Sequence, residues 1–376
     1  MARIVAALSG GVDSAVAAAR LVEAGHDVTA VHLALLRDPA TLRPGARGCC
    51  SLADANDARR VADTLGIPFY VWDFSEAFQQ AVVDDFVAGY AAGRTPNPCL
   101  RCNQTIKFAG LLQRALALGF DGVATGHYAR LVHRDDGVVE LHRGADKGKD
   151  QSYVLGVMTQ DGLRHAWFPL GESTKPEVRA EAAARGLRVA DKPESMDLCF
   201  IPDGDTAGWL AARLGERPGA IVDEAGEVLG AHQGTYHYTI GQRKGLNLRR
   251  PAPDGQPRFV VGLDAGAEAV IVGPRQHLAV SALTGTPALW CEGAAPAEPF
   301  AATVQVRAHG AEHEALVTPA DDGEAGGITV ALPSPIIGVA PGQTAVIYDG
   351  TRVVGSATIT GTTPAASAQT TKSGAM

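Results

Sequence analysis

The chain has 376 residues, enough for two or three domains, and 46% hydrophobic with 20% charged residues is the composition of a globular protein. Its net charge of −8 argues against a broad, sequence-blind nucleic-acid binder. No apolar run approaches the ~20 residues that span a bilayer, and the start lacks the features of a signal peptide. Six cysteines are too few for a disulfide scaffold. We therefore expect a cytoplasmic protein with thiols reduced at rest and no membrane partner. Local basic patches are indicated at Lys147/Lys149, Arg213/Arg217, Arg243/Lys244 and Arg249/Arg250.

The first half of the chain alternates between predicted strands and helices. Residues 3–8 indicate a strand, 13–24 a helix, 27–35 a second strand, 53–65 a helix and 67–74 a third strand. Helices at 76–92 and 106–118 follow, and then a short strand at 122–125. This alternation is typical of an α/β fold whose parallel sheet carries helices on both faces. Ligands bind such sheets at the carboxyl ends of the strands.

The pattern changes farther along the chain. Residues 130–133 and 138–142 predict a hairpin with its turn at Asp136-Gly137, and residues 175–185 predict another helix. From about residue 203 short strands alternate with Gly, Pro and Asp, so this half is mainly β. The tail, 361–376, is rich in Thr, Ala and Ser and is expected to be disordered. The strands of the β half are predicted at 219–222, 228–230, 259–264, 269–272, 302–306, 328–331, 343–348 and 353–359.

A glycine-rich turn follows the first predicted strand. The string Ser9-Gly10-Gly11-Val12-Asp13-Ser14 places two residues without Cβ between a strand and a helix, so that backbone N–H groups can face an anion closely. Asp13 and Ser14 are candidates to cap the helix, and Asp13 also to reach a phosphate-bound Mg²⁺. No Gly-Lys-Ser/Thr follows, so this is not a Walker A loop. The string resembles the pyrophosphate-binding (PP) loop of the ATP pyrophosphatases, which split ATP to AMP and pyrophosphate.

Two cysteines stand in contexts unlike those of buried structural thiols. Cys102 follows a Pro-rich segment and precedes the helix at 106–118, where the helix N-terminus, Arg101 and Lys107 favour a thiolate. Cys199 lies in a segment rich in turn residues. If both thiols reach one cleft, they can carry a persulfide and then close a disulfide. Cys291 and the pair Cys49-Cys50 lack such a context, and we interpret them as structural.

Cys99 and Cys102 form a C-x-x-C pair, which is compatible with a redox pair or with half of a metal site. A closed zinc site needs a second pair, and only Cys199 or the adjacent Cys49-Cys50 are available. An iron–sulfur cluster on Cys99, Cys102 and Cys199 with one open position remains an alternative.

Several longer motifs occur together and in one order. They resemble the bacterial tRNA-specific 2-thiouridylases over residues 1 to about 360. The resemblance implies a PP-loop catalytic domain at 1–203, a small mainly β central domain at 204–278, a C-terminal β-barrel at 279–360 and the tail at 361–376. The motifs are Ser9–Ser14, Pro96-Asn97-Pro98 with Cys102-Asn103, Ala124-Thr125-Gly126-His127-Tyr128, Lys149-Asp150-Gln151-Ser152-Tyr153, Cys199-Phe200-Ile201 and His237-Tyr238-Thr239-Ile240-Gly241-Gln242-Arg243-Lys244-Gly245.

The resemblance implies an ATP- and Mg²⁺-dependent 2-thiolation of the wobble uridine of tRNA. ATP would adenylate the uracil C2 oxygen, a persulfide on Cys199 would deliver sulfur, and Cys102 would resolve the intermediate, leaving a Cys102–Cys199 disulfide and AMP. The sulfur would come from a cysteine desulfurase or a relay protein. Reaching C2 requires a base splayed out of the anticodon stack.

The resemblance also implies roles for further residues. The ATP site would comprise Ala7, Leu8, Ser9, Gly10, Gly11, Val12, Asp13, Ser14, Leu33 and Gly126. Contacts to tRNA would come from Asn97, Pro98, Cys99, Lys149, Asp150, Gln151, Arg243, Lys244 and Arg307. Two departures stand out. The family usually has Asp where this chain has Cys99, so Asp150, a water or the Cys99 thiol would have to replace that carboxylate. An Arg-Tyr motif is replaced by Arg307-Ala308-His309, which removes a stacking tyrosine.

Two other classes of function stay open at this point. A different ATP pyrophosphatase, such as a synthetase or another tRNA sulfurtransferase, fits the loop, but a synthetase does not need paired cysteines. A nucleotide-sensing or RNA-binding scaffold whose thiols bind metal is the non-enzymatic alternative. Absorbance of an iron–sulfur cluster, or a failure to form AMP with tRNA, would distinguish these classes from the thiouridylase.

Overall fold

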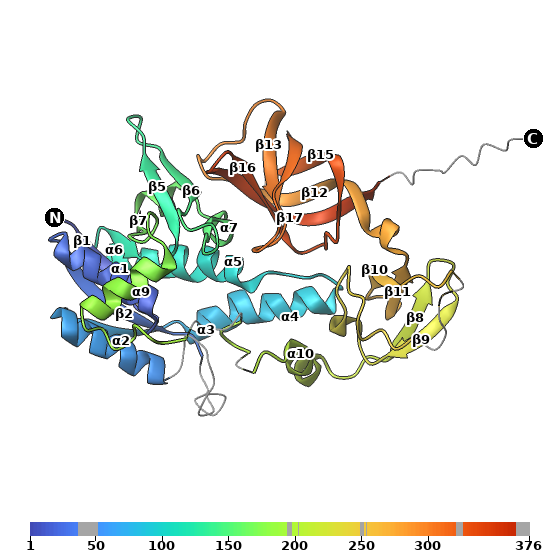
Figure 1. Cartoon of the computed structure of the whole chain (residues 1–376), viewed down its shortest axis with the longest axis horizontal. Coiled ribbons are helices and arrows are strands. Elements are labelled where there is room, and N and C mark those ends of the chain that lie inside the picture. The colour runs from blue at the N-terminus through green and yellow to red at the C-terminus, as the bar shows by residue number, and fades with distance from the viewer. Residues whose placement is uncertain are drawn as a thin grey trace, which may run out of the picture.

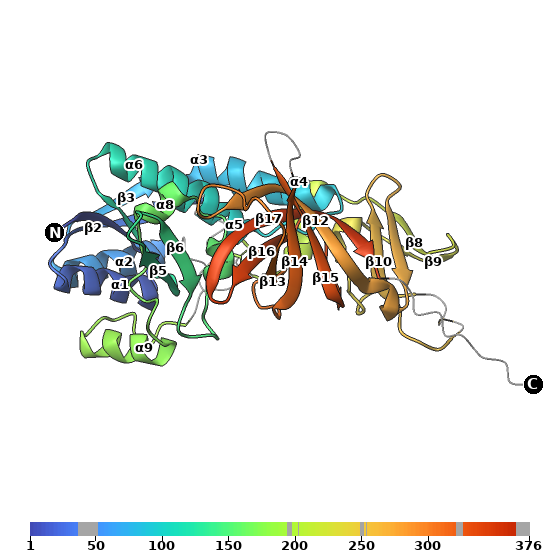
Figure 2. The ribbon, with the colours of Figure 1, turned by 90° about the horizontal axis from the view of Figure 1, so that it is seen from above.

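A computed structural model shows an α/β body, a small β-rich unit and a barrel along one elongated molecule (Figures 1 and 2). The structure describes residues 1–36, 52–193, 198–201, 203–248, 252, 254–320 and 326–365. Cys49-Cys50, Met196-Asp197, Pro202 and Arg249/Arg250 lie outside the described residues. None of the described helices is both long enough and apolar enough to cross a membrane.

The N-terminal body is built on a parallel sheet. Its strand order is β3-β2-β1-β4-β7, and every pairing in it is parallel. Ile4 and Ala6 of β1 pack with the helices on one face, whereas Val5 between them packs with α6 on the other, as strand alternation requires. Both faces are therefore covered, which confirms the predicted fold class. The strands are β1 (Arg3–Ala7), β2 (Asp27–Ala34), β3 (Phe69–Asp73), β4 (Gly122–Ala124) and β7 (Ala166–Trp167), and the helices of the first face are α1 (Val12–Glu23), α2 (Leu52–Leu65) and α9 (Lys175–Ala184).

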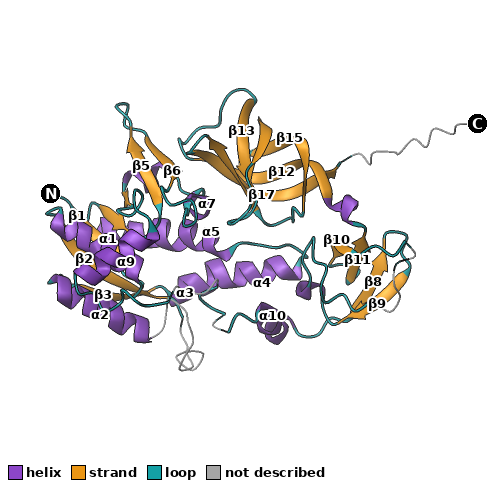
Figure 3. Ribbon diagram, viewed as in Figure 1, coloured by secondary structure: helices purple, strands orange, loops and turns teal. Residues whose placement is uncertain are grey.

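Two long helical rods cross the molecule (Figure 3), and each contains a π-helical segment. The first runs through α3 (Ser75–Phe78), η2 (Gln79–Val83) and α4 (Asp84–Ala91), and the second through α5 (Pro98–Cys102), η3 (Asn103–Leu111) and α6 (Leu112–Ala117). The prediction that the second helix begins near residue 106 is wrong. It begins at Pro98, because Asn97 Oδ1 accepts hydrogen bonds from the N–H groups of Cys99 and Leu100, at 3.0 and 3.4 Å. Cys102 therefore lies within the helix.

The C-terminal barrel closes through six strands. Their order is β12-β15-β14-β13-β16-β17, and β12 also pairs with β17. A core that includes Leu283, Val304, Val330 and Ile347 fills the interior. The strands are β12 (Ala279–Trp290), β13 (Phe300–Gln305), β14 (His313–Ala320), β15 (Gly327–Ile337), β16 (Thr344–Asp349) and β17 (Arg352–Pro364).

The predicted tail begins too early. Strand β17 continues past residue 361, and its last residues, Thr362 to Pro364, pair with β12 opposite Val280 to Leu283. The barrel therefore includes part of the segment that was expected to be disordered. The remainder, 366–376, lies outside the described residues.

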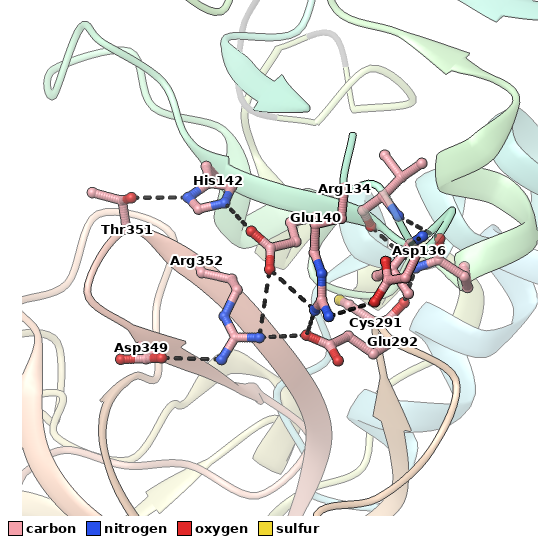
Figure 4. Close-up of polar contacts among 12 residues, drawn as sticks. Arg134, Asp136, Glu140, His142, Cys291, Glu292, Asp349, Thr351 and Arg352 are labelled. Atoms are coloured by element: carbon pink, nitrogen blue, oxygen red, sulfur yellow. Dashed lines mark hydrogen bonds and ion pairs between the residues drawn. The ribbon is translucent and has the colours of Figure 1, made fainter. Parts of the chain in front are cut away.

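The hairpin predicted around Asp136-Gly137 is confirmed, and it ties the barrel to the N-terminal body. Its strands are β5 (Ala129–His133) and β6 (Val139–Arg143), and His142 of β6 pairs with Arg352 of β17. An ion-pair cluster crosses this junction (Figure 4). Arg352 contacts Glu292, and the Arg134 guanidinium lies 3.5 Å from both Glu292 and Glu140. Two short helices follow the hairpin, α7 (Ser152–Leu155) and α8 (Gln160–Arg164).

The central unit is mainly β, as predicted, but it begins with a helix that the sequence patterns missed. Helix α10 (Thr206–Leu214) starts where the Asp205 carboxylate accepts a hydrogen bond from the Gly208 N–H. A four-stranded sheet follows in the order β10-β11-β8-β9. Its elements are β8 (Gly219–Asp223), β9 (Val228–His232), η4 (Thr235–His237), β10 (Phe259–Asp264), β11 (Ala269–Gly273) and η5 (Arg275–Leu278).

Candidate active site

A cavity of about 820 Å³ lies at the carboxyl ends of the parallel strands and extends to the barrel. The N-terminal body contributes the ends of β1 and β2, the start of α1 and the first turn of α5, and the barrel contributes the segment after β13. Both proposed catalytic cysteines line this one cavity. Its lining includes Ala7, Leu8, Ser9, Asp13, Ser14, Leu33, Asn97, Pro98, Cys99, Cys102, Gly126, Asp150, Gln151, Cys199 and Arg307.

The glycine turn forms one wall of the cavity through a tight local network. Ser9 N–H donates to Ser14 Oγ, and Ser14 Oγ donates to the Gly11 carbonyl, each at 3.2 Å. Gly10 has φ of +78°, and a Cβ there would lie 2.3 Å from the carbonyl oxygen of Asp54, so only glycine fits. Gly10, Gly11 and Val12 do not line the cavity but form the turn behind it. The capping expectation is wrong, because Gly11 occupies the N-cap position of α1 without a side-chain cap.

Gly126 holds the other side of this cradle. A Cβ at this position would lie 2.6 Å from the backbone nitrogen of Ser14 and 2.7 Å from the carbonyl carbon of Asp13. The loop after β4 therefore approaches the first turn of α1 as closely as backbones can. A backbone cradle at a helix N-terminus, bounded by glycines that exclude side chains, fits the phosphates of a nucleotide. Leu33, at the end of β2, adds an apolar wall to the same cavity.

Two lysines that the sequence patterns missed flank the glycine turn. Lys175 Nζ lies 2.7 Å from both carboxylate oxygens of Asp13, and Tyr128 Oη donates to the same carboxylate. Asp13 is therefore engaged by a cation from this chain. Lys192 Nζ donates to the Gly10 carbonyl at 2.8 Å. The Lys175–Asp13 ion pair is neutral as a whole and ties the start of α9 to the start of α1.

A pair of carboxylates holds Lys192 in the charged form. Burial by itself lowers the pKa of this lysine, but hydrogen bonds from Lys192 to Asp54 and Asp57 outweigh burial and raise the pKa above its ordinary value. Asp54 is also the residue whose backbone packs against Gly10. The lysine therefore fixes the back of the glycine turn to α2.

The structure brings Cys102 and Cys199 together. Both belong to one apolar cluster that also contains Phe86 and Phe200, and both line the cavity. Cys102 is 8% exposed, and Cys199 is half-buried. Cys99 lines the same cavity one helical turn before Cys102 and is exposed. Within the described residues, no group of three or more His, Cys, Asp or Glu side chains is arranged to hold a metal ion.

A buried histidine provides a neutral wall next to the cradle. Burial, and after it the positive charge of Lys107, hold the pKa of His127 well below its usual value. Its Nδ1 lies 2.7 Å from Thr125 Oγ1, and its ring packs edge-on against Phe168. His127 is therefore an uncharged hydrogen-bonding group, and it lines the cavity beside Gly126.

A polar relay connects the Asp150 segment to the barrel. Arg143 donates to the Asp150 carboxylate at 2.9 Å and to Gln305 Oε1 at 3.2 Å, and its guanidinium stacks 3.6 Å from the Tyr348 ring centroid. Gln305 Nε2 in turn donates to the carbonyl groups of Arg307 and Ala308. The relay fixes the segment that carries Arg307 into the cavity. Sequence reasoning missed Arg143, because its partner Gln305 is 162 residues away.

The predicted tRNA-contact residues divide into two groups. Asn97, Pro98, Asp150, Gln151 and Arg307 line the cavity, together with Cys99. Lys149, Arg243 and Lys244 do not. The Asp150 carboxylate also accepts hydrogen bonds from the Gly144 N–H and the Ser152 hydroxyl. The Ser152 N–H and Arg143 also donate to it, so four groups of the chain bind this carboxylate, which makes it a structural anchor.

Sheet, cradle and cavity together define an α/β protein in which a cradle that fits nucleotide phosphates and two cysteines share one cavity. Models of known protein families match the three parts of this fold in order along the chain. A model described as tRNA methyl transferase HUP domain matches residues 2–203, the corresponding PRC-barrel domain matches 207–274, and an aminomethyltransferase beta-barrel domain matches 280–359.

Curated relatives give the family more narrowly. The tRNA-specific 2-thiouridylase MnmA of a Nocardioides species is 62% identical over 96% of this chain and 98% of the relative. The protein of that name from Streptomyces avermitilis is 60% identical over 97% of this chain and 96% of its own length. The one from Kineococcus radiotolerans is 62% identical over 96% and 99%. The chain therefore belongs to the tRNA-specific 2-thiouridylase family.

Proposed function

We propose that this protein thiolates the wobble uridine of tRNA at C2, consuming ATP and releasing AMP and pyrophosphate. The observation that carries the proposal is a single cavity that joins a phosphate cradle, Cys102, Cys199 and a segment of the barrel. Family membership and the names of the relatives supply the substrate class. The same cavity holds a group for activating an oxygen and two groups for delivering sulfur, which is the combination this reaction needs.

The first step is activation of the uracil carbonyl. The C2 oxygen attacks the α-phosphorus of ATP, and the bond to pyrophosphate breaks. The N–H groups of the glycine turn and the N-terminus of α1 stabilise negative charge on the departing pyrophosphate. Mg²⁺ on the ATP phosphates adds positive charge there. Neutral His127 and Leu33 keep the adjoining wall free of further charge.

The second step is sulfur transfer. The terminal sulfur of a persulfide on Cys199 attacks C2. Cys102 thiolate then attacks Cys199 Sγ, which breaks the persulfide S–S bond and leaves sulfur on the base, while AMP departs with the former C2 oxygen. The products are 2-thiouridine, AMP and a Cys102–Cys199 disulfide. The shared apolar cluster of Cys102 and Cys199 keeps water from the activated base.

The partners in this proposal are a tRNA and a donor of persulfide sulfur, a cysteine desulfurase or a relay protein. Asn97, Pro98 and Cys99 surround the splayed base, and Arg307 binds phosphate at the cavity mouth. Lys149, Arg243 and Lys244 contact tRNA outside the cavity. The reduced thiols that the reaction requires fit the cytoplasm. An iron–sulfur cluster on Cys99, Cys102 and Cys199 is the alternative use of the same thiols, although the described residues do not arrange these three side chains to hold a metal ion. Visible absorbance of the purified protein would reveal such a cluster.

The test is thiolation of unmodified tRNA with ATP, Mg²⁺ and a low-molecular-weight persulfide, with mercury-affinity gels reporting 2-thiouridine. Wild type forms product, and Cys102→Ser and Cys199→Ser do not. The matched control is Cys291→Ala, which removes a buried thiol outside the cavity and keeps wild-type activity. Absence of product from wild type, or full activity in Cys199→Ser, would contradict the proposal.

A further inference from the structure

The cavity contains a third cysteine. Cys99, Cys102 and Cys199 all line it, and they differ in how far each is exposed. Cys102 is 8% exposed and Cys199 is half-buried, both within the apolar cluster that holds Phe86 and Phe200. Cys99 is exposed. A disulfide between the two inner cysteines is therefore sheltered from a reductant, whereas the outer cysteine is within reach of one.

The position of Cys99 on the helix matches the geometry of a disulfide to Cys102. The two are three residues apart in α5, and ideal helix geometry places such Cα atoms about 5 Å apart. Disulfides bridge Cα atoms roughly 4.4–6.8 Å apart. Asn97 fixes the start of this helix by accepting hydrogen bonds from the Cys99 and Leu100 N–H groups.

We propose that Cys99 is the thiol that resets this site. The inference rests on the proposed function, which leaves a Cys102–Cys199 disulfide after each turnover. Cys99 thiolate attacks Cys102 Sγ, a Cys99–Cys102 bond forms, the Cys102–Cys199 bond breaks, and the electron pair leaves with Cys199. The exchange conserves the oxidation level, so it consumes neither oxidant nor reductant.

The exchange has two consequences for the catalytic cycle. Cys199 returns to the thiolate form that accepts the next persulfide sulfur. The oxidised pair now includes the exposed Cys99, whose Sγ a dithiol reductant of the thioredoxin type can attack to regenerate both thiols. Because of this exchange, Cys199 can accept new persulfide sulfur before Cys102 has been reduced.

The test maps disulfides after a single turnover without reductant. Wild type is mixed with tRNA, ATP, Mg²⁺ and a low-molecular-weight persulfide, quenched in acid, alkylated with N-ethylmaleimide and digested without reduction. We expect a peptide that links Cys99 to Cys102, with Cys199 alkylated. In Cys99→Ser we expect the Cys102–Cys199 link instead, in the molecules that have formed 2-thiouridine. With a dithiol reductant, the steady-state rate of Cys99→Ser falls about tenfold, because the remaining disulfide is sheltered.

Other outcomes overturn the inference. If wild type makes 2-thiouridine and keeps the Cys102–Cys199 link, Cys99 does not exchange, although the proposed function stands. If Cys99→Ser loses the first turnover while Cys99→Asp keeps it, position 99 acts on a proton and not in exchange. If wild type makes no 2-thiouridine, the proposed function fails. In that case the exchange can still be tested by oxidising the protein with one equivalent of diamide, without tRNA, and mapping the disulfide. A Cys99–Cys102 disulfide would support the exchange, and a Cys102–Cys199 disulfide would reject it.

Discussion

Gly126→Ala is the smallest change that closes the phosphate cradle. The new Cβ would lie 2.6 Å from the Ser14 backbone nitrogen and 2.7 Å from the Asp13 carbonyl carbon. Ordinary van der Waals contact begins near 3.4 Å, so the loop or the first turn of α1 must move by roughly 0.8 Å. The two nearest neighbours are backbone atoms, and the third is Asp13 Cβ at 3.0 Å, which is fixed to the backbone and cannot rotate aside.

The expected cost of this change follows from that displacement. Overpacking of a rigid site costs about 1–3 kcal/mol. Misplacement by close to 1 Å at a reacting centre costs up to about 100-fold in rate. We therefore expect kcat/KM for ATP, measured as AMP formation, to fall by about 10- to 100-fold in Gly126→Ala, with a lowered Tm.

The assay compares tRNA-dependent AMP formation across ATP concentrations, with Tm measured on the same samples. The control is Gly266→Ala in the central unit, where the added Cβ meets only Asp264 Oδ1 at 3.4 Å. That variant should match wild type in both measurements. Wild-type kinetics in Gly126→Ala would refute the assignment of the cradle, because a nucleotide bound elsewhere would not sense this contact.

Three further predictions test the rest of the molecule. Arg143→Met leaves the Asp150 carboxylate without its cation, so Tm falls and KM for tRNA rises. A lower Tm with unchanged kinetics would show that this hydrogen-bond network stabilises the fold but does not position tRNA. A chain ending at Gly361 loses the last pairs of β17 and melts several degrees lower than one ending at Ala365. Identical Tm values would show that those pairs do not stabilise the barrel. Burial raises the pKa of the Cys291 thiol to about 12. The buried neutral thiol therefore stabilises the folded state below about pH 9, and this stabilisation is lost as the pH rises towards 12. The Tm gap between wild type and Cys291→Ala should therefore narrow over this range, and a constant gap would contradict the assigned pKa.

Local patterns predicted those parts of the fold that local interactions determine. Near-continuous apolar runs identified β1 and β2, and the Gly10-Gly11 pair identified the turn between β1 and α1. The first turn of α5 was missed because Pro96, Asn97 and Pro98 indicate a loop by composition. An Asn cap followed by proline is also a helix start, and that signal was available in the sequence. Strands β12 and β14 carry internal prolines, which weakened their strand patterns.

The candidate site shows the same division. Motif spacing located Cys102, Cys199 and Gly126, since each stands in a short recognisable string. Lys175 and Lys192 were not found, because their partners Asp13 and Gly10 lie 162 and 182 residues away. No local pattern reports such contacts, which arise only when α9 and the segment after it pack on α1. Distances between motifs, and therefore the convergence of two thiols on one cavity, likewise required the folded chain.

The most direct test of the central claim follows the sulfur atom itself. Protein loaded at Cys199 with a radioactive persulfide sulfur is freed of excess donor and mixed with unmodified tRNA, ATP and Mg²⁺ for one turnover. The account predicts that label moves into 2-thiouridine with one AMP formed per labelled base, and that Cys102→Ser keeps its label on the protein. Label in the tRNA from Cys199→Ser, or transfer without AMP, would contradict it.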